Sequence, residues 1–412
     1  MGRRVVKGFG LLGSTGGDVC AGYLEHARAF GPVPGVGADF IDVLDRSGLR
    51  GRGGGAFPTA TKWAAVAAAR ARNPVVLANG AEGEPASAKD RLLMRTRPHL
   101  LIDGTLIAAR TVGARDIVFY VGGAHSDALS AMTAAIAERP EPERSLMTLV
   151  AAPPGYVAGE ETAAVHFIND GVALPLSTPP RPHQRGVNGR PTLVNNVETL
   201  AHVALIARFG DAWFRGGGTG DAPGTLLLTL GGAVQQPGVV EVPNGATVAD
   251  AVRAAGGLHS DCDAVLVGGY FGTWHAGDDA WATRLDAASL RDAGHTLGCG
   301  VVYAKPAHVC GVESTSRVLA YLAGESAQQC GPCVFGLRAI ADALARVAAS
   351  RGGPHDLERL HRWAGVVRGR GACRHPDGAS QFVRSALNVF AGDFDAHAHG
   401  QRCLAKPLAV AS

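Results

Sequence analysis

The chain has 412 residues, of which 46% are hydrophobic and 18% are charged, with a formal net charge of +3. This length predicts two to three domains, the composition is that of a globular protein, and the small net charge argues against a nucleic-acid partner. The first ten residues are basic but are not followed by the apolar stretch of a signal peptide. No run approaches the roughly 18 apolar residues of a spanning helix. We therefore expect a cytoplasmic protein with no direct membrane insertion.

A glycine-rich segment runs from Leu49 to Trp63 and carries glycine at positions 51, 53, 54 and 55. Glycines let a ligand lie against bare backbone, and Arg50, Arg52 and Lys62 add the positive charge that a phosphate requires. We expect a helix from Thr59 to Ala69 with Thr59 as its cap, so that the loop leads into an anion-binding helix N-terminus. The spacing fits neither a Rossmann turn nor a Walker loop. The alternative is a flexible connection between two elements.

From residue 37 to residue 215 the pattern is that of an α/β domain. Residues 74–79 and 116–122 are short apolar runs typical of buried parallel strands, and residues 100–112 and 126–139 have helical spacing. Strands that alternate with helices predict a parallel sheet with ligands at the carboxyl ends of its strands. Asn79 and the turn Glu82-Gly-Glu84 follow one of these strands. Their polar groups therefore belong to the ligand-binding edge.

Two further polar stretches follow in this domain. Glu160 and Glu161 lie in a glycine-flanked turn that leads into a helix closed by Asn169-Asp-Gly171, and this turn is also consistent with an ordinary solvated helix start. Asn195 and Asn196 offer donors and acceptors suited to sugar hydroxyls. Either asparagine can also cap a helix that begins at Val197, and the two roles are compatible.

After a glycine-rich linker at 216–222, the chain has the pattern of a second domain. Residues 225–232 and 238–243 predict a hairpin, 247–255 a helix and 264–269 a strand. This part has no ionisable cluster, so we assign it a structural role. The last hundred residues predict helices at 314–322, 336–349, 355–367 and 379–390. Among eight cysteines, at 20, 262, 299, 310, 330, 333, 373 and 403, only Cys330 and Cys333 have metal-like spacing, and the others are too sparse for a disulfide framework.

The motifs Arg50-Gly-Arg-Gly-Gly-Gly-Ala-Phe-Pro-Thr59, Glu82-Gly-Glu-Pro85 and Lys89-Asp-Arg91, with Asn195-Asn-Val-Glu-Thr-Leu200, resemble the flavoprotein subunit of the respiratory complex I family. That family includes the flavin subunits of NAD-linked hydrogenases and formate dehydrogenases. The resemblance covers nearly the whole chain. It implies that FMN takes a hydride from NADH and that single electrons pass through an iron-sulfur cluster to a ferredoxin-like or thioredoxin-fold partner.

The resemblance also implies a domain plan: an extension at 1–36, a Rossmann-like FMN and NAD(P)H domain at 37–215, a ubiquitin-like β-grasp domain of SLBB type at 222–300, and a helical bundle of iron-sulfur type at 305–412. It implies cofactor contacts from the glycine loop and from the polar edge of the sheet. No catalytic acid or base is expected because the cofactors carry the chemistry, and Glu84 and Glu161 would position the nicotinamide. The implied cofactor-binding residues are Gly51, Arg52, Gly53, Gly54, Phe57, Lys62, Asn79, Glu82, Glu84, Tyr156, Gly159, Glu160, Glu161, Asn195, Asn196 and Thr199.

In the family four cysteines hold a [4Fe-4S] cluster. Cys330, Cys333 and Cys373 match its second, third and fourth ligands, and Ala327 stands at the first. Since such clusters normally have four thiolates, three outcomes are open: a three-cysteine cubane or [3Fe-4S] cluster, loss of the cluster, or a replacement ligand such as Glu325 or His375. Zinc on three cysteines is a weaker alternative.

The nucleotide side departs from the family pattern as well. Ala81 stands where the family has Asp, and Ala56, Ala60 and Ala86 stand where it has Gly. Two aromatic positions are Ala65 and Arg181, and Arg181 could hold a 2′-phosphate and favour NADPH. Two alternatives to a dehydrogenase subunit follow: a non-catalytic FMN-binding scaffold subunit, or a flavoenzyme with another small-molecule substrate.

Overall fold

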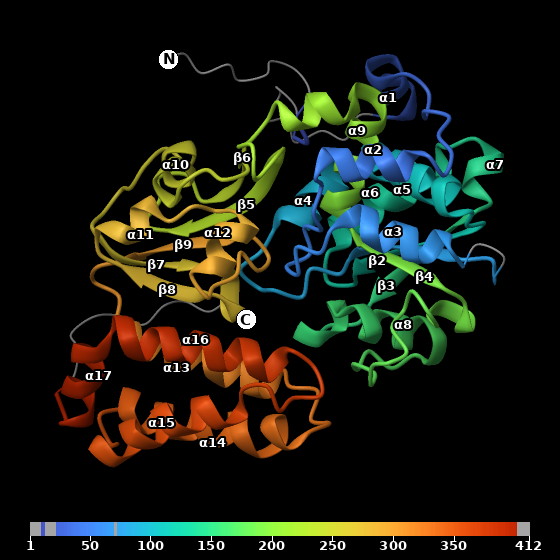
Figure 1. Ribbon diagram of the computed structural model, residues 1–412. Coiled ribbons are helices and arrows are strands. Elements are labelled where there is room, and N and C mark those ends of the chain that lie inside the picture. The colour runs from blue at the N-terminus through green and yellow to red at the C-terminus, as the bar shows by residue number, and fades with distance from the viewer. Residues whose placement is uncertain (1–9, 13–21, 70–71, 402–412) are drawn as a thin grey trace. The chain divides into compact units, whose positions relative to one another are not determined.

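The computed structural model describes residues 10–12, 22–69 and 72–401. The N-terminal residues, Cys20 and Cys403 lie outside these ranges. The chain forms two compact units (Figure 1). The first contains residues up to Gly83, Ala88–Leu227 and Glu241–Ala246, and the second contains Glu84–Ser87, Leu228–Val240 and residues from Thr247 onward.

The first unit is built on a four-stranded parallel sheet. Its strands are β1 (Val75–Gly80), β2 (Asp116–Gly122), β3 (Met147–Ala152) and β4 (Thr192–Asn196). Their order is β3-β2-β1-β4, and every neighbouring pair is parallel. The chain therefore winds outward from β1 in one direction to β3 and then crosses back to β4. In such sheets the crevice outside the carboxyl ends of the two strands at the reversal binds ligands, which here are β1 and β4.

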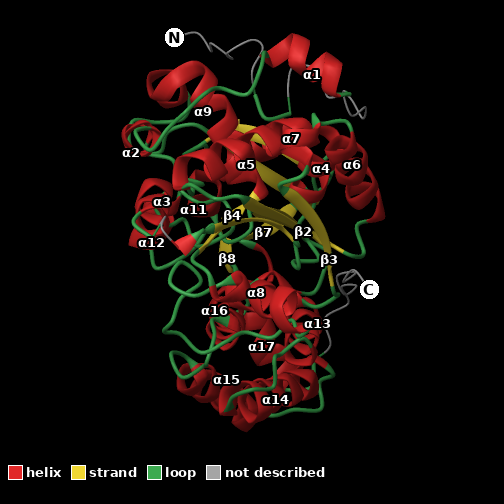
Figure 2. Cartoon of the chain, turned by 90° about the vertical axis from the view of Figure 1, so that its right-hand side faces the viewer, coloured by secondary structure: helices red, strands yellow, loops and turns green. Residues whose placement is uncertain are grey.

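Helices cover both faces of this sheet (Figure 2). Helices α5 (Pro98–Val112), α6 (Ser126–Ala137) and α9 (Val197–Arg215) pack on one face, and α8 (Glu161–Asp170) packs on the other. The remaining elements of this unit are α1 (Tyr23–Phe30), α2 (Phe40–Ser47), α3 (Thr59–Ala67), α4 (Lys89–Thr96), α7 (Glu141–Arg144), and the short turns η2 (Tyr156–Gly159) and η3 (Val187–Gly189).

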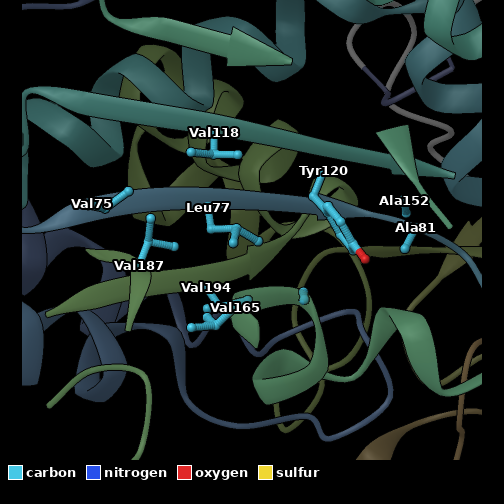
Figure 3. Close-up of a cluster of buried hydrophobic side chains, with 10 residues drawn as sticks. Val75, Leu77, Ala81, Val118, Tyr120, Ala152, Val165, Val187 and Val194 are labelled. Atoms are coloured by element: carbon cyan, nitrogen blue, oxygen red, sulfur yellow. The ribbon is translucent and has the colours of Figure 1, made fainter. Parts of the chain in front are cut away.

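Alternation along the strands explains the core beneath α8. Val75 and Leu77 of β1 share a face with Val118 and Tyr120 of β2, and they pack against residues of α8 such as Val165. Figure 3 shows these side chains, and in it the Tyr120 hydroxyl points toward Ala81 at the carboxyl end of β1. The same alternation places Asn79 on this face, where the apolar run ends and the polar edge begins.

A mixed five-stranded sheet has the order β6-β5-β9-β7-β8. Its strands are β5 (Thr225–Gly232), β6 (Gly238–Pro243), β7 (Cys262–Val267), β8 (Thr273–Ala276) and β9 (Val301–Pro306), with α10 (Val248–Ala254), η4 (Gly269–Phe271), α11 (Asp278–Ala282) and α12 (Ala287–Asp292) between them. The first and last strands, β5 and β9, pair in parallel, and β7 pairs antiparallel with both β8 and β9. This arrangement is that of a β-grasp sheet. Thr247 forms a capping box with Asp250 at the start of α10.

Helices occupy the C-terminal part of the second unit. They are α13 (Gly311–Gly324), the π-helical turn η5 (Pro332–Leu337), α14 (Arg338–Ala348), α15 (Pro354–Val367), α16 (His375–Val389) and α17 (Ala391–Ala398). Helix α14 packs between α13 and α15, and α16 packs against α13, α15 and β8. Buried Leu337, Leu344, Leu360 and Phe382 are part of its apolar interior.

The structure confirms most of the elements expected from the sequence and corrects one local detail. The predicted strands 225–232 and 238–243 and the helix end at Gly171 are as expected. Thr59 as a helix cap is wrong: Pro58 holds that position, and the buried Thr59 hydroxyl has no hydrogen-bond partner. The strands β3, β4, β8 and β9 and the helices α1, α2, α4, α7, α11, α12 and α17 were not predicted from the sequence. Within the described ranges, no helix has the length and apolar character needed to span a bilayer.

Candidate functional site

The reversal point of the parallel sheet brings two asparagines together. Asn79 of β1 and Asn196 of β4 are direct partners in the strand register. Asn79 Nδ2 donates to Gly159 O at 2.8 Å, which ties η2 to this edge. Asn196 Oδ1 accepts the Glu198 N–H at 3.0 Å and caps α9, as the sequence analysis allowed, and its Nδ2 donates to Asp90 Oδ2 at 2.7 Å. The asparagine pair thus joins β1, β4 and the starts of two helices.

Asn195 is adjacent in sequence but faces the other way, because successive residues of a strand alternate. Its Oδ1 accepts the buried Trp63 indole N–H at 2.9 Å. This bond fixes α3, the helix that follows the glycine loop, against β4. The two asparagines that the sequence analysis treated together therefore have different surroundings.

The glycine loop folds back on itself and packs on the N-terminus of α9. Gly51 N donates to Phe57 O at 2.9 Å, and Arg52 N donates to Thr199 Oγ1 at 2.9 Å. A β-carbon on Gly53 would lie 3.2 Å from Asn196 Cβ, so this position is tight. Gly54 has a φ of +100°, which glycine adopts at little cost. The loop backbone therefore lies beside the N-terminus of the 19-residue helix α9, an arrangement that favours an anionic ligand.

Ala56 takes a φ of +46° in this loop. Residues with a β-carbon adopt that region at a cost, which gives a physical reason for the glycine that the family has at this position. Phe57, the next residue, is 53% exposed. An exposed aromatic ring beside a glycine loop is available to a bound ring system.

A buried charge network lies next to the glycine loop. Lys89 Nζ donates to Asp90 Oδ1 and to Glu198 Oε2, both at 2.8 Å, and Arg52 Nε lies 4.0 Å from Glu198 Oε1. Burial lowers the pKa of Lys89, but the two carboxylates outweigh it and raise the pKa. Lys89 is therefore a fixed cation. The sequence analysis quoted Lys89 only as part of a motif, because its partner Glu198 lies 109 residues away.

Arg52 connects this network with the loop. Its guanidinium donates to Thr225 O at 3.0 Å, while its buried Nε has no hydrogen-bond partner. Burial lowers the pKa of Arg52, and Glu198 opposes that shift. Beside it, burial and the Arg52 charge hold the pKa of the imidazole of His202 well below its usual value. His202 is therefore neutral, and the ions of this network are the cations Arg52 and Lys89 and the carboxylates of Asp90 and Glu198.

The two predicted glutamates of the second motif have distinct roles. Glu160 accepts the N–H groups of Thr162 and Ala163 and caps α8, and burial raises the pKa of its carboxyl. Glu161 Oε2 instead accepts from Lys62 Nζ at 2.9 Å, and Lys62 also donates to Val194 O at 2.9 Å. Both side chains of the Lys62–Glu161 pair are about a quarter to a third exposed. Glu160 thus builds the turn, and the Lys62–Glu161 pair is available to a ligand.

The turn after β1 packs closely on η2. Glu82 has a φ of +44°, and its carboxylate accepts the N–H groups of Asp90 and Arg91 at the start of α4. A β-carbon on Gly83 would lie 2.8 Å from Tyr156 O. Gly159, at the other end of η2, has its carbonyl bound by Asn79. These contacts bring Asn79, Glu82, Tyr156 and Gly159 into one cradle, as the sequence analysis expected of a single site.

Glu84 differs from the other predicted site residues. Its side chain is buried and accepts the Tyr270 N–H at 2.8 Å and the Ala86 N–H at 3.2 Å. Residues Glu84–Ser87 belong to the second compact unit. Both of these hydrogen bonds therefore lie within the second unit.

The three predicted metal ligands lie in the second unit around η5. Cys333 is buried, whereas Cys330 and Cys373 are partly exposed. Burial and the neighbouring thiols of Cys330 and Cys373 raise the pKa of Cys333 to about 12, so both of these thiols lie close enough to Cys333 to act on it. Across the described ranges, no group of three His, Cys, Asp or Glu side chains has the geometry of a closed metal site. His375, which the sequence offers as a replacement ligand, is hydrogen-bonded through Nε2 to Leu322 O at 2.7 Å.

The first unit fits FMN by its own chemistry. It presents a glycine loop at a helix N-terminus, the buried Arg52 Nε without a hydrogen-bond partner, and amide and carboxylate groups at the reversal point of the sheet. A flavin phosphate needs the first two, and ribityl hydroxyls need the third. The cysteine donor set is softer and suits iron-sulfur chemistry, with three thiols in place of four.

Comparison with known families gives three matches in chain order. Residues 44–205 match the Nuo51 FMN-binding domain, residues 227–269 match the SLBB domain, and residues 313–397 match the NADH-ubiquinone oxidoreductase-F iron-sulfur binding region. The first match contains the whole cradle. The third contains Cys330, Cys333 and Cys373.

Individual relatives extend over nearly the full chain. An NADH-quinone oxidoreductase F subunit of Rhizobium meliloti is 33% identical over 395 residues, covering 93% of each chain. The NADP-reducing hydrogenase subunit HndC of Solidesulfovibrio fructosivorans is 29% identical, covering 93% of this chain and 80% of the relative. The solved structure of an NAD+-reducing [NiFe]-hydrogenase in the H2-reduced state superposes with a TM-score of 0.78 at 32% identity. That match covers 87% of this chain, which spans 62% of the hydrogenase chain.

Proposed function

Because this chain belongs to the family of NADH-quinone oxidoreductase F subunits, we infer that it is a flavoprotein oxidoreductase subunit. It takes hydride from NADH or NADPH onto FMN and passes single electrons toward an iron-sulfur site and a protein partner. The observation that carries this conclusion is the cradle at the sheet reversal, where the glycine loop meets the N-terminus of α9. Bound FMN supplies the change from two-electron to one-electron chemistry.

The residues of the chain bind and orient in this reaction. The loop from Gly51 to Gly54 and the α9 N-terminus would hold the FMN phosphate, with Arg52 beneath them. Asn79 and Asn196 would hold the ribityl chain. Lys62 is fixed by Val194 O and Glu161, so its ammonium can donate a charge-assisted hydrogen bond to the ring system. Phe57 and Glu161 would position the nicotinamide, whereas the carboxylate of Glu84 is already bound to the Tyr270 N–H.

The electron exit is part of the same proposal. Cys330, Cys333 and Cys373 would hold the iron-sulfur cluster. A ferredoxin-like or thioredoxin-fold protein would accept the electrons, in line with relatives that are subunits of larger oxidoreductases. We also propose a cytoplasmic location, because eight cysteines in 412 residues are too sparse for the disulfide framework of a secreted protein. We further propose the four-part domain plan predicted from the sequence, in which residues 305–412 form a helical bundle of iron-sulfur type.

An anaerobic absorbance titration of the FMN-loaded protein with NADH, and separately with NADPH, tests the proposal. We expect rapid bleaching of the flavin band with one of the two nucleotides. A slower loss of broad absorbance would follow if three cysteines hold a cluster. Equal rates with NADH and NADPH that do not change in R181A would remove the 2′-phosphate role of Arg181.

A non-catalytic scaffold protein is the second candidate, and a specific observation favours it. Ala327 occupies the position of the first cluster ligand, and the cysteines of the described chain do not form a closed site. A bound flavin that neither nucleotide bleaches would support the scaffold or a different small-molecule substrate. The same result would overturn the dehydrogenase proposal.

A further inference from the structure

An exposed aromatic side chain lies directly beside the predicted cluster ligands. Phe335 is 75% exposed, although it belongs to the same six-residue π-helical turn as the buried Cys333. Large apolar side chains at such exposure are uncommon among the described residues. Because most of its ring is exposed, Phe335 contributes little to the core, and its position next to the thiols indicates an external contact.

The end of α15 extends this apolar patch. Val366 is 46% exposed. Its neighbour Val367 packs so closely on Gly336 that a β-carbon there would overlap the Val367 side chain. Helix α15 therefore ends against η5, and Val366 and Phe335 belong to two elements in direct contact. Val366 and Phe335, which together are called the apolar patch below, are thus carried by two packed elements of the fold.

Positive charge follows immediately in the chain. Residues 365–374 contain Arg368, Arg370 and Arg374 and no acidic residue. Arg368 and Arg370 are exposed, and neither takes part in an ion pair within the described residues. Arg374 is 92% exposed and lies 3.1 Å from Asp377. Asp377 also accepts the Gly369 N–H at 2.6 Å, which fixes the segment.

The charge decides among possible occupants. A second copy of this chain would bring the same arginines against the patch, and residues 402–412 carry Arg402 and Lys406 and no acid. Both are repelled rather than attracted. A nucleic acid would satisfy the arginines but not the apolar centre formed by Phe335 and Val366. An acidic protein surface with an apolar centre satisfies both parts.

We propose that Phe335, Val366, Arg368, Arg370 and Arg374 form a docking surface for an acidic electron-carrier protein. This inference rests on the proposed function, because it names the partner that receives electrons beside Cys330, Cys333 and Cys373. Phe335 anchors the contact, and the arginines steer and orient the acidic partner. The short path from the docked partner to the thiols follows from the two-residue separation of Phe335 and Cys333.

The test uses the full-length purified protein and a small acidic [2Fe-2S] ferredoxin as the probe. Its dissociation constant is measured by fluorescence anisotropy at low and at high salt. We expect R368E/R370E to weaken binding about 10- to 100-fold at low salt, with the difference shrinking at high salt. We expect F335S to weaken binding about tenfold or more at both salt concentrations, because its contribution is apolar. R291E, an exposed charge reversal at the end of α12, is the matched control and should leave binding unchanged.

Three results would overturn the surface: no ferredoxin binding by the wild-type protein at low salt, equal weakening by R291E, or equally tight binding of a basic cytochrome c or a short single-stranded oligonucleotide. NADH-dependent reduction of ferricyanide, measured in parallel, reports the proposed function without the partner. If the wild-type protein binds ferredoxin but does not reduce ferricyanide with NADH, the dehydrogenase function is rejected and the docking surface is still supported. If circular dichroism shows that F335S does not fold, the R368E/R370E variant on the exposed segment still tests the docking surface.

Discussion

Replacing Lys89 by methionine should destabilise the first unit more than any single surface change in it. Lys89 and Glu198 are 3% and 1% exposed, and the lysine bonds both Glu198 and Asp90. K89M removes one cation and leaves two carboxylates, and among the residues that the structure describes only Glu198 then has another cation, Arg52, at 4.0 Å. Breaking a buried pair in this way costs about 3–5 kcal/mol. That is a large part of a typical stability of about 5–15 kcal/mol.

The neighbouring contacts predict a smaller effect for E198Q. Glu198 Oε1 accepts the Leu227 N–H at 2.9 Å, and a glutamine carbonyl can keep that bond. Lys89 also keeps Asp90. We therefore expect about 1.5–3 kcal/mol for E198Q, and a double variant K89M/E198Q that is less destabilised than the sum of the two by about 1–3 kcal/mol.

Because the chain has two compact units, a global melt is not a two-state measurement. Native-state hydrogen exchange followed by mass spectrometry on peptides from β1 and α9 reports opening of the first unit alone. R91M is the matched control, since Arg91 lies on the same helix as Lys89 but its ion pair with Asp127 of α6 is exposed, and its loss should cost about 0–1 kcal/mol. A K89M protein within about 1 kcal/mol of wild type, or no more destabilised than R91M, would refute the reasoning.

Three further predictions concern the cradle, the cysteine site and the pH dependence. G83A places a β-carbon 2.8 Å from a carbonyl that cannot move freely. It should cost about 1–3 kcal/mol and weaken FMN binding by flavin fluorescence quenching, whereas G35A, with no atom within 4 Å, should change neither. A327C restores a fourth thiolate, so reconstituted protein should show the electron paramagnetic resonance signal of a reduced [4Fe-4S] cluster; the absence of that signal from reduced, reconstituted A327C would contradict this. Burial and the nearby His295 lower the pKa of His275 from 6.5 to about 4, so the unfolded chain binds the extra proton first as the pH falls. The stability that neutral His275 contributes to the second unit is therefore complete above pH 6.5 and is lost as the pH falls toward 4. In H275N the urea midpoint of the second unit should depend less on pH over this range.

The sequence alone determined the elements that depend on local patterns. Apolar β-branched runs predicted β1, β2, β5 and β6, because such runs favour strands wherever they lie. Glycine at 171 predicted the end of α8, since a left-handed residue closes a helix locally. The Cys330–Cys333 spacing and the glycine loop indicated the two candidate sites for a similar reason. Each signal lies within about ten residues.

The tertiary structure decided everything that depends on which distant residues meet. Strand order places Asn79 beside Asn196 across 117 residues and separates Asn195 onto the other face. Packing joins Lys89 to Glu198, and it ties Glu84 to Tyr270 of the second unit. It also decides that Phe335 is exposed beside Cys333. Such pairings follow from sheet register and from burial summed over the whole fold, and a spacing pattern in one dimension carries neither.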